Sequence, residues 1–394
     1  MGLSVKFFCV FKVFWLSLCL CTTATEINVT HGTADYAAFF GNLTVEFDSD
    51  ELGCPDSIGP LDAYIWRGSG YGSNTNYMML PWLNAIGYGR KDLALVTADK
   101  GEKRDFFDRV KCLEASNGVV AEGFSCIFEP MPHVCFFRTH KEWDNFMIER
   151  KLSTAEREYA LEHIAVKDDR EMIGGIKDYL EGSGIDILRA KAVLLDYFHS
   201  HRQPWVKRDI QAILDEPAIA TLRDGPYVAI HVRRGDKIGV GAISHDVQEY
   251  LEKARSYIQN SSEATVSVDD MKGIWLSSDD DQVIFDVKES FAEFFPNVEP
   301  ERVIWISGRP SETTDASSSN GIPTRVQGMT YEMYVVFFTE LKMLSQANVF
   351  IGTYSSNVGR MIVLLRESRG MPRSSSLSLD HPDWFPNRHL LVAG

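Results

Sequence analysis

The sequence predicts an α/β fold whose two halves face a cleft. Three observations predict it: short apolar runs rich in β-branched and aromatic residues, helical spacing between those runs, and a restart of the alternation after Asp224-Gly225-Pro226. A chain of 394 residues is long enough for two or three domains. We therefore divide it into a leader at 1–24, an N-terminal half at 25–225 and a C-terminal half at 226–394.

The N-terminal half contains one predicted βαβ unit. A strand that includes Ile65 leads into a glycine-rich turn at Gly68–Gly72 and a helix over about residues 76–86, and Leu93–Thr97 forms the second strand. Further helical spacing covers residues 154–166, 186–201 and 207–222, with Pro204 and Pro217 as breakers. Two serine clusters, at 317–319 and 374–376, are predicted to be surface loops.

The C-terminal half has the clearer alternation. Its predicted strands are Tyr227–Val232, Gly273–Ser277, Val303–Ser307 and Asn348–Thr353. Its predicted helices are Val247–Gln259, Gln282–Phe295, Tyr331–Ser345 and Asn357–Glu367. Short apolar strands that alternate with helices predict a buried parallel sheet in a doubly wound, Rossmann-like domain.

Composition excludes several classes of protein. A hydrophobic content of 44% and a charged content of 24% exclude a mainly disordered, collagen-like or polytopic membrane chain. The 55 acidic and 40 basic residues give a formal charge of −15, which argues against a nucleic-acid binder. A small phosphate-bearing ligand remains compatible with this charge, because a few clustered arginines are enough to hold one.

The first residues have the pattern of a targeting segment. The apolar stretch Phe7–Cys21, interrupted by Lys12 and followed by Thr22-Thr23-Ala24, predicts a cleaved signal peptide. The alternatives are a short signal-anchor, with residues 7–21 as the only membrane contact, and a segment without a targeting role. Three sequons agree with secretion and begin at Asn28, Asn42 and Asn260.

Cysteine usage fits an oxidising compartment. Cys54, Cys112, Cys126 and Cys135 follow the leader, and four cysteines allow two disulfides with three pairings. The alternative is four free, buried thiols. No paired Cys or His spacing suggests a zinc site.

The segment His231–Gly239 is the sharpest candidate for chemistry. Arg233, Arg234 and Lys237 lie within five residues, directly after a predicted strand, and Asp236 is placed to orient a guanidinium. Ligands bind at the carboxyl ends of strands in open α/β sheets, and arginine matches phosphate oxygens two at a time. The alternative is a cluster of surface salt bridges.

This segment resembles the donor-binding motif of the α-1,6-fucosyltransferases, glycosyltransferase family 23. Further segments match that family in the same order: Gly68–Asn74, Trp275–Asp280, and Leu344–Asn348 followed by Gly352–Asn357 with Arg360. Four ordered blocks over about residues 65–365 are more specific than any one of them. The resemblance implies a GT-B-like glycosyltransferase fold with two Rossmann-like domains.

The resemblance also implies an inverting transfer of L-fucose from GDP-fucose without a metal or other cofactor. It places the catalytic candidates at Arg233, Arg234, Asp236, Lys237, Asp279 and Asp280. It places the donor-binding candidates at Gly70, Tyr71, Gly72, His231, Arg233, Glu340, Ser355 and Ser356. In this assignment the arginines stabilise the leaving diphosphate, the two serines form an anion site with the next helix, and Glu340 accepts from guanine.

Several of these residues have alternative interpretations. The Asp279–Asp281 run resembles a manganese-binding Asp-x-Asp pattern, and Asp281 alternatively caps the following helix. Glu340 alternatively lies on a solvated helix face, and the glycines alternatively form only a tight turn.

The chain also departs from the family pattern. A glutamate that the family is proposed to use as catalytic base falls at Gly241, so Asp246 and Glu249 are the nearest substitutes in sequence. Two family cysteines are Ser69 and Ser73 here, a family threonine is Gly235, and a family aspartate is Glu340.

These observations predict a fucosyltransferase of the Golgi lumen whose acceptor is the core N-acetylglucosamine of N-glycans. Alternative acceptors are a protein hydroxyl and a chitin oligosaccharide, and a non-enzyme alternative is a secreted protein that binds GDP or sugar without turnover. The expected partners are GDP-fucose and an oligosaccharide or glycoprotein, with no nucleic acid. The sequence does not indicate an oligomeric state.

Overall fold

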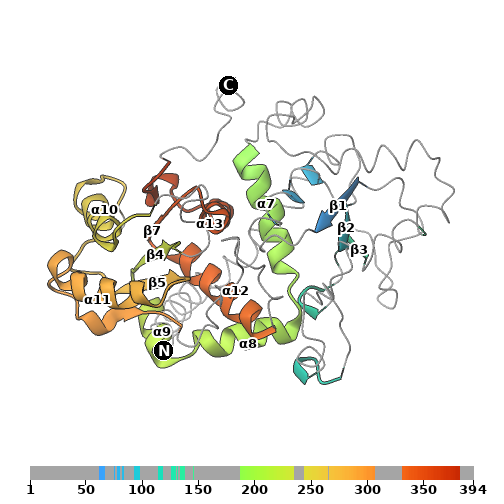
Figure 1. The fold of residues 1–394 in the computed structure, drawn as a ribbon, viewed down its shortest axis with the longest axis horizontal. Helices are drawn as coiled ribbons and strands as arrows, with labels where there is room; N and C mark the ends of the chain where they lie inside the picture. The colour runs from blue at the N-terminus through green and yellow to red at the C-terminus, as the bar shows by residue number, and fades with distance from the viewer. Residues whose placement is uncertain are drawn as a thin grey trace, which may run out of the picture. The chain divides into compact units, whose positions relative to one another are not determined.

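The computed structural model describes residues 62–66, 75, 78–79, 82–83, 93–97, 114–118, 126–129, 131, 134–137, 145, 187–234, 244–264, 266–306 and 331–381 (Figure 1). Every described residue belongs to one compact unit, Phe47–Gly394.

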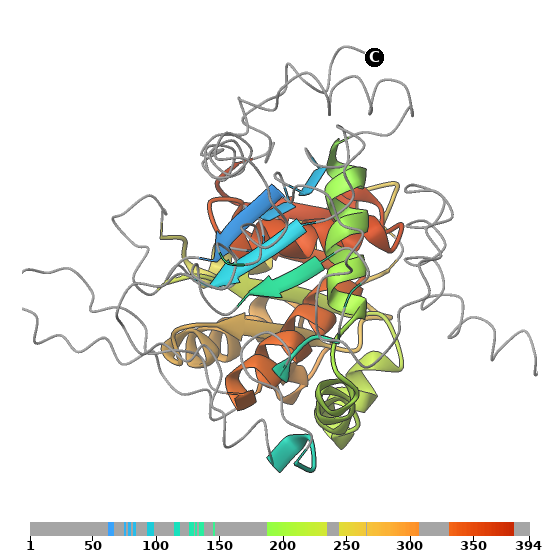
Figure 2. The ribbon, with the colours of Figure 1, turned by 90° about the vertical axis from the view of Figure 1, so that its right-hand side faces the viewer.

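The first sheet has three parallel strands in the order β1-β2-β3 (Figure 2). They are β1 (Asp62–Trp66), β2 (Leu93–Thr97) and β3 (Val134–Phe137). The chain between β1 and β2 contains helical residues whose side chains are buried: Thr75, Met78, Met79, Trp82 and Leu83. The predicted βαβ unit is therefore confirmed, whereas β3 was not predicted.

In the described residues just before the second sheet, the chain forms the helices α7 (Ile187–Ser200), α8 (Pro204–Leu214) and α9 (Pro217–Arg223). The helical spacing predicted over 207–222, with Pro217 as a breaker, is confirmed: α8 ends at Leu214 and Pro217 begins α9, as Pro204 begins α8. Proline lacks the N–H that the first helical turn leaves unpaired, so it fits there without loss. The prediction for 186–201 is confirmed within one residue at each end.

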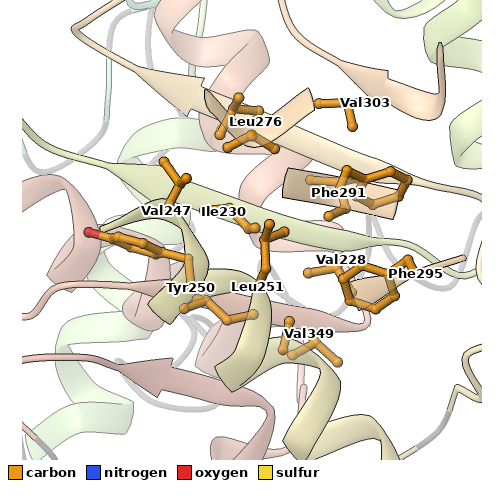
Figure 3. Close-up of a cluster of buried hydrophobic side chains, with 14 of the residues drawn as sticks. Val228, Ile230, Val247, Tyr250, Leu251, Leu276, Phe291, Phe295, Val303 and Val349 are labelled. Atoms are coloured by element: carbon orange, nitrogen blue, oxygen red, sulfur yellow. The ribbon is translucent and has the colours of Figure 1, made fainter. Parts of the chain in front are cut away.

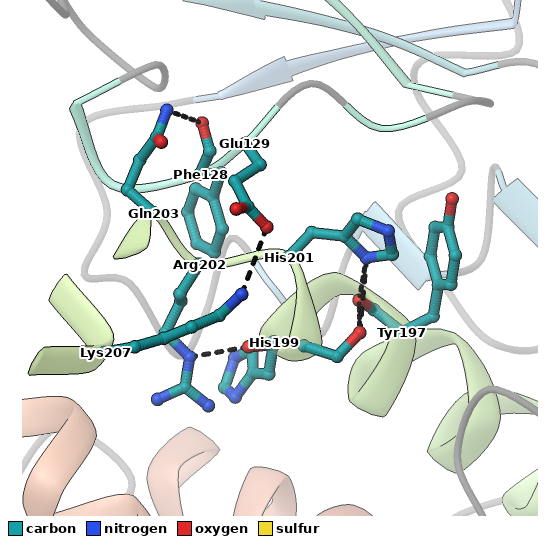
Figure 4. A network of polar contacts seen from close by, with 9 residues as sticks. Phe128, Glu129, Tyr197, His199, His201, Arg202, Gln203 and Lys207 are labelled. Carbon is teal, nitrogen blue, oxygen red and sulfur yellow. Dashed lines mark hydrogen bonds and ion pairs between the residues drawn. The ribbon is translucent and has the colours of Figure 1, made fainter. Parts of the chain in front are cut away.

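Backbone and side-chain hydrogen bonds hold residues 126–129 on the α7–α8 connection (Figure 4). Gln203 donates from its N–H to Ile127 O at 2.8 Å and from Nε2 to Phe128 O at 3.0 Å. The Lys207 ammonium lies 3.1 Å from Glu129. Cys126 in the same segment is fully buried and, like Cys135, is disulfide-bonded.

The second sheet has five parallel strands in the order β6-β5-β4-β7-β8. They are β4 (Val228–Val232), β5 (Ile274–Ser278), β6 (Val303–Ile304), β7 (Val349–Gly352) and β8 (Ser376–Ser378). Numbered along the chain, this is the 3-2-1-4-5 order of a doubly wound domain, and its switch point lies between β4 and β7.

The helices between these strands are α10 (Val247–Asn260), α11 (Gln282–Phe294), α12 (Tyr331–Gln346) and α13 (Asn357–Ser368). Each agrees with its predicted helix to within one residue. The parallel α/β class predicted from the sequence is confirmed.

One face of the second sheet carries a large apolar core (Figure 3). Val228, Ile230 and Val232 of β4 pack there with residues of α10 and α11. Alternate residues of a strand point to opposite faces, so His231 points to the other face. Helix α12 contacts β4 and β5 but contributes nothing to this core, so it covers the face of His231.

The structure corrects the prediction of a surface loop at residues 374–376. Ser376 begins β8, and Ser375 is buried in the short 3-10 helix Arg373–Ser375. The buried Arg366 of α13 explains this, because its Nε donates to Ser376 Oγ at 2.8 Å and its Nη2 to Ser375 Oγ at 2.6 Å. A hydrophobicity pattern does not detect a strand that is held through serine hydroxyls.

Several predictions fall outside the described residues: the leader, the helix at 154–166, the serine cluster at 317–319, Cys54, Cys112, Asn28 and Asn42. The boundary at residue 225 and the cleft stay predictions. Among the helices that the structure describes, none is long and apolar enough to cross a membrane.

Candidate active site at the carboxyl edge of the second sheet

Strand register brings three loops together at the switch point. Val232 pairs with Ser278, so the residues after them, Arg233 and Asp279, leave neighbouring strands at the same level. On the other side of β4, Ile230 pairs with Ile351, which brings the turn after Gly352 to this edge as well. The candidates predicted from three separate sequence blocks thus share one edge of the sheet.

Asp279 organises the arginine pair. Its Oδ2 lies 2.5 Å from Arg233 Nη1, and its Oδ1 accepts from the backbone N–H of Arg234 at 2.8 Å. The exposed fractions of the Arg233 and Asp279 side chains are 20% and 10%. One carboxylate therefore fixes both the side chain of the first arginine and the backbone of the second.

Arg234 is held by two more carboxylates. Its Nη1 lies 3.2 Å from Asp286 Oδ2 and 3.8 Å from Asp280 Oδ2. The alternative interpretation, in which Arg233 and Arg234 belong to a cluster of salt bridges, is therefore correct as far as their ion pairs are concerned. It does not conflict with ligand binding, because a guanidinium has five N–H donors and a carboxylate uses one or two of them.

The helix-capping alternative for Asp281 is confirmed in position, because Asp281 is the N-cap residue of α11, but its side chain makes no capping bond. The neighbouring Asp280 accepts from the N–H of Gln282 through its Oδ1 at 3.0 Å. Within the described ranges no group of three or more His, Cys, Asp or Glu side chains is placed to hold a metal ion.

His231 and Glu340 are both buried, His231 on the face of β4 that α12 covers and Glu340 within α12. His231 is 6% exposed in β4, and Glu340 is 4% exposed in α12. The alternative of a solvated helix-face glutamate is therefore wrong. Both side chains make contacts within the protein.

The β7–α13 turn carries Ser355 and Ser356. Ser356 caps α13, where its Oγ accepts from the N–H of Gly359 at 3.5 Å. Arg360 of the first turn donates from Nε to Tyr354 O at 2.6 Å, which holds the turn against the helix.

Asp380, just beyond β8, is a site residue that sequence reasoning missed. Its carboxylate accepts from the N–H of Tyr354 at 2.8 Å, the N–H of Ser355 at 3.0 Å and the hydroxyl of Ser378 at 2.6 Å. Burial raises the pKa of this carboxyl, but the hydrogen bonds from Ser355, Ser378 and the turn backbone outweigh it and lower the pKa to about 2. Asp380 is therefore an anion that already occupies two N–H groups of the turn.

Tyr250, in the first turn of α10, lies near both Asp380 and the arginine pair. Its side chain is buried, and burial raises the pKa of its phenol, with smaller effects from Asp380, Arg234, Glu249 and Asp279. Figure 3 shows its hydroxyl oxygen directed away from the apolar core. The phenol therefore lies at the polar edge that the arginines share.

The two nearby carboxylates considered as substitute bases stand at the start of α10, where Asp246 is the N-cap residue. Glu249 accepts from the N–H of Asp246 at 2.9 Å and bonds to Nδ1 of His245 at 3.0 Å. The hydrogen bond from His245 and then that from Asp246 lower the pKa of Glu249. These contacts fix the start of α10 and make Glu249 a weak base.

The remaining candidates, Gly70, Tyr71, Gly72, Asp236 and Lys237, lie outside the described residues, as do Gly235 and Gly241. The described part of the site is thus formed by the ends of β4, β5 and β7, the start of α10 and the residue after β8. Fixed guanidinium groups beside a helix N-terminus can stabilise an anion, and buried His and Glu side chains on the adjacent face can bind a heterocyclic base.

Comparisons with known proteins identify the same region. Residues 193–380 match the model of the α-(1,6)-fucosyltransferase N- and catalytic domains. An α-(1,6)-fucosyltransferase of Drosophila melanogaster is 29% identical over 138 residues, which are 34% of this chain and 19% of that protein. An α-(1,6)-fucosyltransferase of Caenorhabditis elegans is 28% identical over 167 residues, 42% of this chain and 26% of that protein.

The matched region thus spans about a quarter or less of these relatives. Among solved structures, the NodZ α-1,6-fucosyltransferase co-crystallized with GDP is similar at 15% identity. That match covers 78% of this chain and 93% of the NodZ chain, with a TM-score of 0.39.

Proposed function

We propose that this protein is an inverting fucosyltransferase that moves L-fucose from GDP-fucose to a glycan, because residues 193–380 match the model of the α-(1,6)-fucosyltransferase N- and catalytic domains. The observation that carries the proposal is the position of Arg233. It stands at the switch point of a doubly wound sheet, held by Asp279 and level with the turn that precedes α13.

The leaving group sets the main chemical requirement. When the bond between fucose and GDP breaks, negative charge develops on the β-phosphate, and fixed donors lower the energy of that state. Arg233 supplies planar N–H donors, and its ion pair with Asp279 holds the guanidinium in one orientation. Ser355 and Ser356, at the start of α13, add hydroxyl groups and the positive end of a helix dipole.

The nucleotide base has a candidate position on the α12 side of the sheet. A glutamate carboxylate matches the N1–H and N2–H donors of guanine, and Glu340 is buried in the helix that covers β4. His231 of β4 lies on the same face. Burial supports this role, because water competes less for a desolvated hydrogen bond.

The acceptor and the compartment complete the proposal. The family supports transfer to the 6-hydroxyl of the core N-acetylglucosamine of N-glycans, with a protein hydroxyl or a chitin oligosaccharide as alternative acceptors. The leader-like segment, the sequons and the disulfide-bonded Cys126 and Cys135 support a place in the secretory pathway, in the Golgi lumen.

A transfer assay tests the activity. Purified protein is incubated with labelled GDP-fucose and EDTA, together with a truncated N-glycan that bears terminal N-acetylglucosamine, a chitin oligosaccharide, or a folded protein acceptor. We expect a fucosylated N-glycan with the label at the 6-position. Absence of product from every acceptor would contradict the proposal, and a product formed only after metal addition would contradict the metal-independent mechanism.

A binding measurement separates a transferase from a protein that only binds the donor. Calorimetry with GDP is compared for the wild type, Arg233→Met and the control Arg255→Met, whose guanidinium is exposed on α10 and makes one long contact, 3.5 Å, to Glu293 O. We expect the affinity for GDP to fall about tenfold to a hundredfold in Arg233→Met alone. GDP binding without any transfer would indicate a binding-only protein.

A further inference from the structure

Transfer to a hydroxyl requires a group that receives the hydroxyl proton. A side chain does this best when it offers a lone pair and has a pKa near the working pH. Three of the described carboxylates at the carboxyl edge are poor candidates. Asp279 and Asp286 are paired with arginines, and Asp380 accepts several hydrogen bonds and has a pKa of about 2.

His245 offers such a lone pair. It lies just before α10, its side chain is 11% exposed, and its Nδ1 lies 3.0 Å from Glu249 Oε2. Because a carboxylate only accepts, this contact places the ring proton on Nδ1 and leaves the lone pair on Nε2. The Nε2 atom is buried and has no hydrogen-bond partner.

The position of His245 in the fold places it at the edge that carries the arginines. Strand β4 ends at the carboxyl edge, so the helix that returns along the sheet, α10, starts there. The His245 ring meets the Tyr250 ring edge to face, with centroids 6.3 Å apart at 89°. The charges of Arg234, Asp279 and Asp380 affect the pKa of the Tyr250 phenol, so this ring lies near all three side chains.

We propose that His245 is the general base of the transfer and that Glu249 is its positioning residue. The inference rests on the proposed function, and it names a residue outside the family motif. Nε2 takes the proton from the acceptor hydroxyl while the hydroxyl oxygen forms its bond to C1 of fucose. The bond from C1 to the β-phosphate oxygen breaks, its electron pair leaves with GDP, and the imidazolium later returns its proton to water.

The charges around the ring favour this role. Glu249, whose Oε2 lies 3.0 Å from Nδ1 of the ring, is placed to stabilise the imidazolium that forms during transfer. The guanidinium of Arg234, at the same edge of the sheet, is paired with Asp286 and Asp280.

The test uses His245→Gln, Glu249→Gln and the control His381→Gln. His381 is an exposed histidine that follows Asp380. For His245→Gln we expect kcat to fall about a hundredfold, with KM for GDP-fucose and the affinity for GDP within about twofold of the wild type. Glu249→Gln should lower kcat about tenfold because the ring then lacks its carboxylate, and His381→Gln should match the wild type.

The pH dependence distinguishes a base from a structural residue. Because a protonated imidazole accepts no proton, wild-type kcat should fall at acidic pH, and His245→Gln should lack this fall. A His245→Gln kcat within about threefold of the wild type would overturn the inference while leaving the fucosyltransferase proposal intact. A matching loss of GDP affinity or of thermal stability would also overturn it, and a wild type without transfer would overturn both.

Discussion

Two arginines at opposite edges of the second sheet have opposite surroundings. Arg233, at the carboxyl edge, is partly exposed and faces the carboxylate of Asp279. Arg366, at the amino edge, is 1% exposed and donates to the neutral oxygens of Ala347, Asn348, Ser375 and Ser376.

This difference in surroundings indicates a ligand-binding role for Arg233 and a structural role for Arg366. Arg366 joins the starts of β7 and β8 through one side chain, and burial lowers its pKa to about 10. A charge held only by neutral acceptors has no capacity left for a ligand. Arg233 has a compact partner and an exposed side, which suits a group that must meet a substrate anion.

The largest effect should follow from removing the buried arginine. Arg366→Met leaves several buried oxygens without a donor, so we expect the free energy of unfolding to fall by about 3–4 kcal/mol. Urea denaturation measures this. The control Arg373→Met removes an exposed guanidinium paired with Glu367, 2.7 Å away, and should cost less than about 1 kcal/mol. Equal losses for the two variants would contradict the comparison.

The same substitution at the carboxyl edge should affect activity more than folding. We expect Arg233→Met to lower fucose transfer about a hundredfold, because one donor to the developing charge is lost. Its free energy of unfolding should fall by about 2 kcal/mol, less than for Arg366→Met, because the largely buried Asp279 loses its ion partner but keeps the hydrogen bond from the N–H of Arg234. Initial rates and urea denaturation on the same preparation check both values, and a loss of stability as large as that of Arg366→Met would contradict the assignment.

The amino edge also carries a destabilising cation, Lys342 in α12. Burial lowers the pKa of its ammonium to about 8, with further lowering by Arg223, Arg202 and Arg369. The folded pKa is below the unfolded value, so at pH 7 the charged form costs stability, and this cost falls as the pH rises above about 8. We expect Lys342→Met to stabilise the protein by about 1–2 kcal/mol at pH 7.

Thermal unfolding at pH 7 and pH 9 checks this sign. The gain of Lys342→Met over the wild type should shrink at pH 9, where Lys342 is largely neutral. Lys253→Met, an exposed position on α10, serves as the control and should change little at either pH. A destabilised Lys342→Met would show that the ammonium forms a favourable contact.

The smallest effect concerns Asp380 at the carboxyl edge. Its folded pKa of about 2 lies below the unfolded value of 3.8, so its contribution is present above about pH 4 and is lost as the pH falls through 2. We expect Asp380→Asn to destabilise the protein by about 1 kcal/mol at pH 7, allowing for solvent screening. The difference from the wild type should decrease steadily between pH 4 and pH 2. A difference that does not depend on pH would assign the effect to lost packing.

The apolar elements of the second sheet were predictable from sequence, and the polar ones were not. Strand β4 is buried at every position, and its run of Val, Ala and Ile gives a clear signal. Strand β8 is Ser-Leu-Ser and depends on Arg366, ten residues before it, so no local pattern indicates it. Pro204 and Pro217 were assigned as breakers although proline also begins helices.

In the candidate site, too, residues next to apolar strands were predictable from sequence, whereas residues next to polar elements were not. Arg233 and Asp279 were predictable because each directly follows an apolar strand, and parallel register then brings them together. Asp380 follows a strand that the sequence does not reveal, and it reaches Tyr354 and Ser355 only through the fold. The pairing of His245 with Glu249 has helical spacing, but a His and a Glu four residues apart are too common to single out.

The edges of the second sheet have a consequence for the behaviour of the protein at high concentration. Its outer strands, β6 and β8, contain only two and three residues, whereas the inner strands contain four or five. A short edge exposes few unpaired N–H and C=O groups to another chain, and strand-by-strand aggregation starts from such groups. The apolar strands β4, β5 and β7 are thus shielded from neighbouring molecules by the two shortest strands of the sheet.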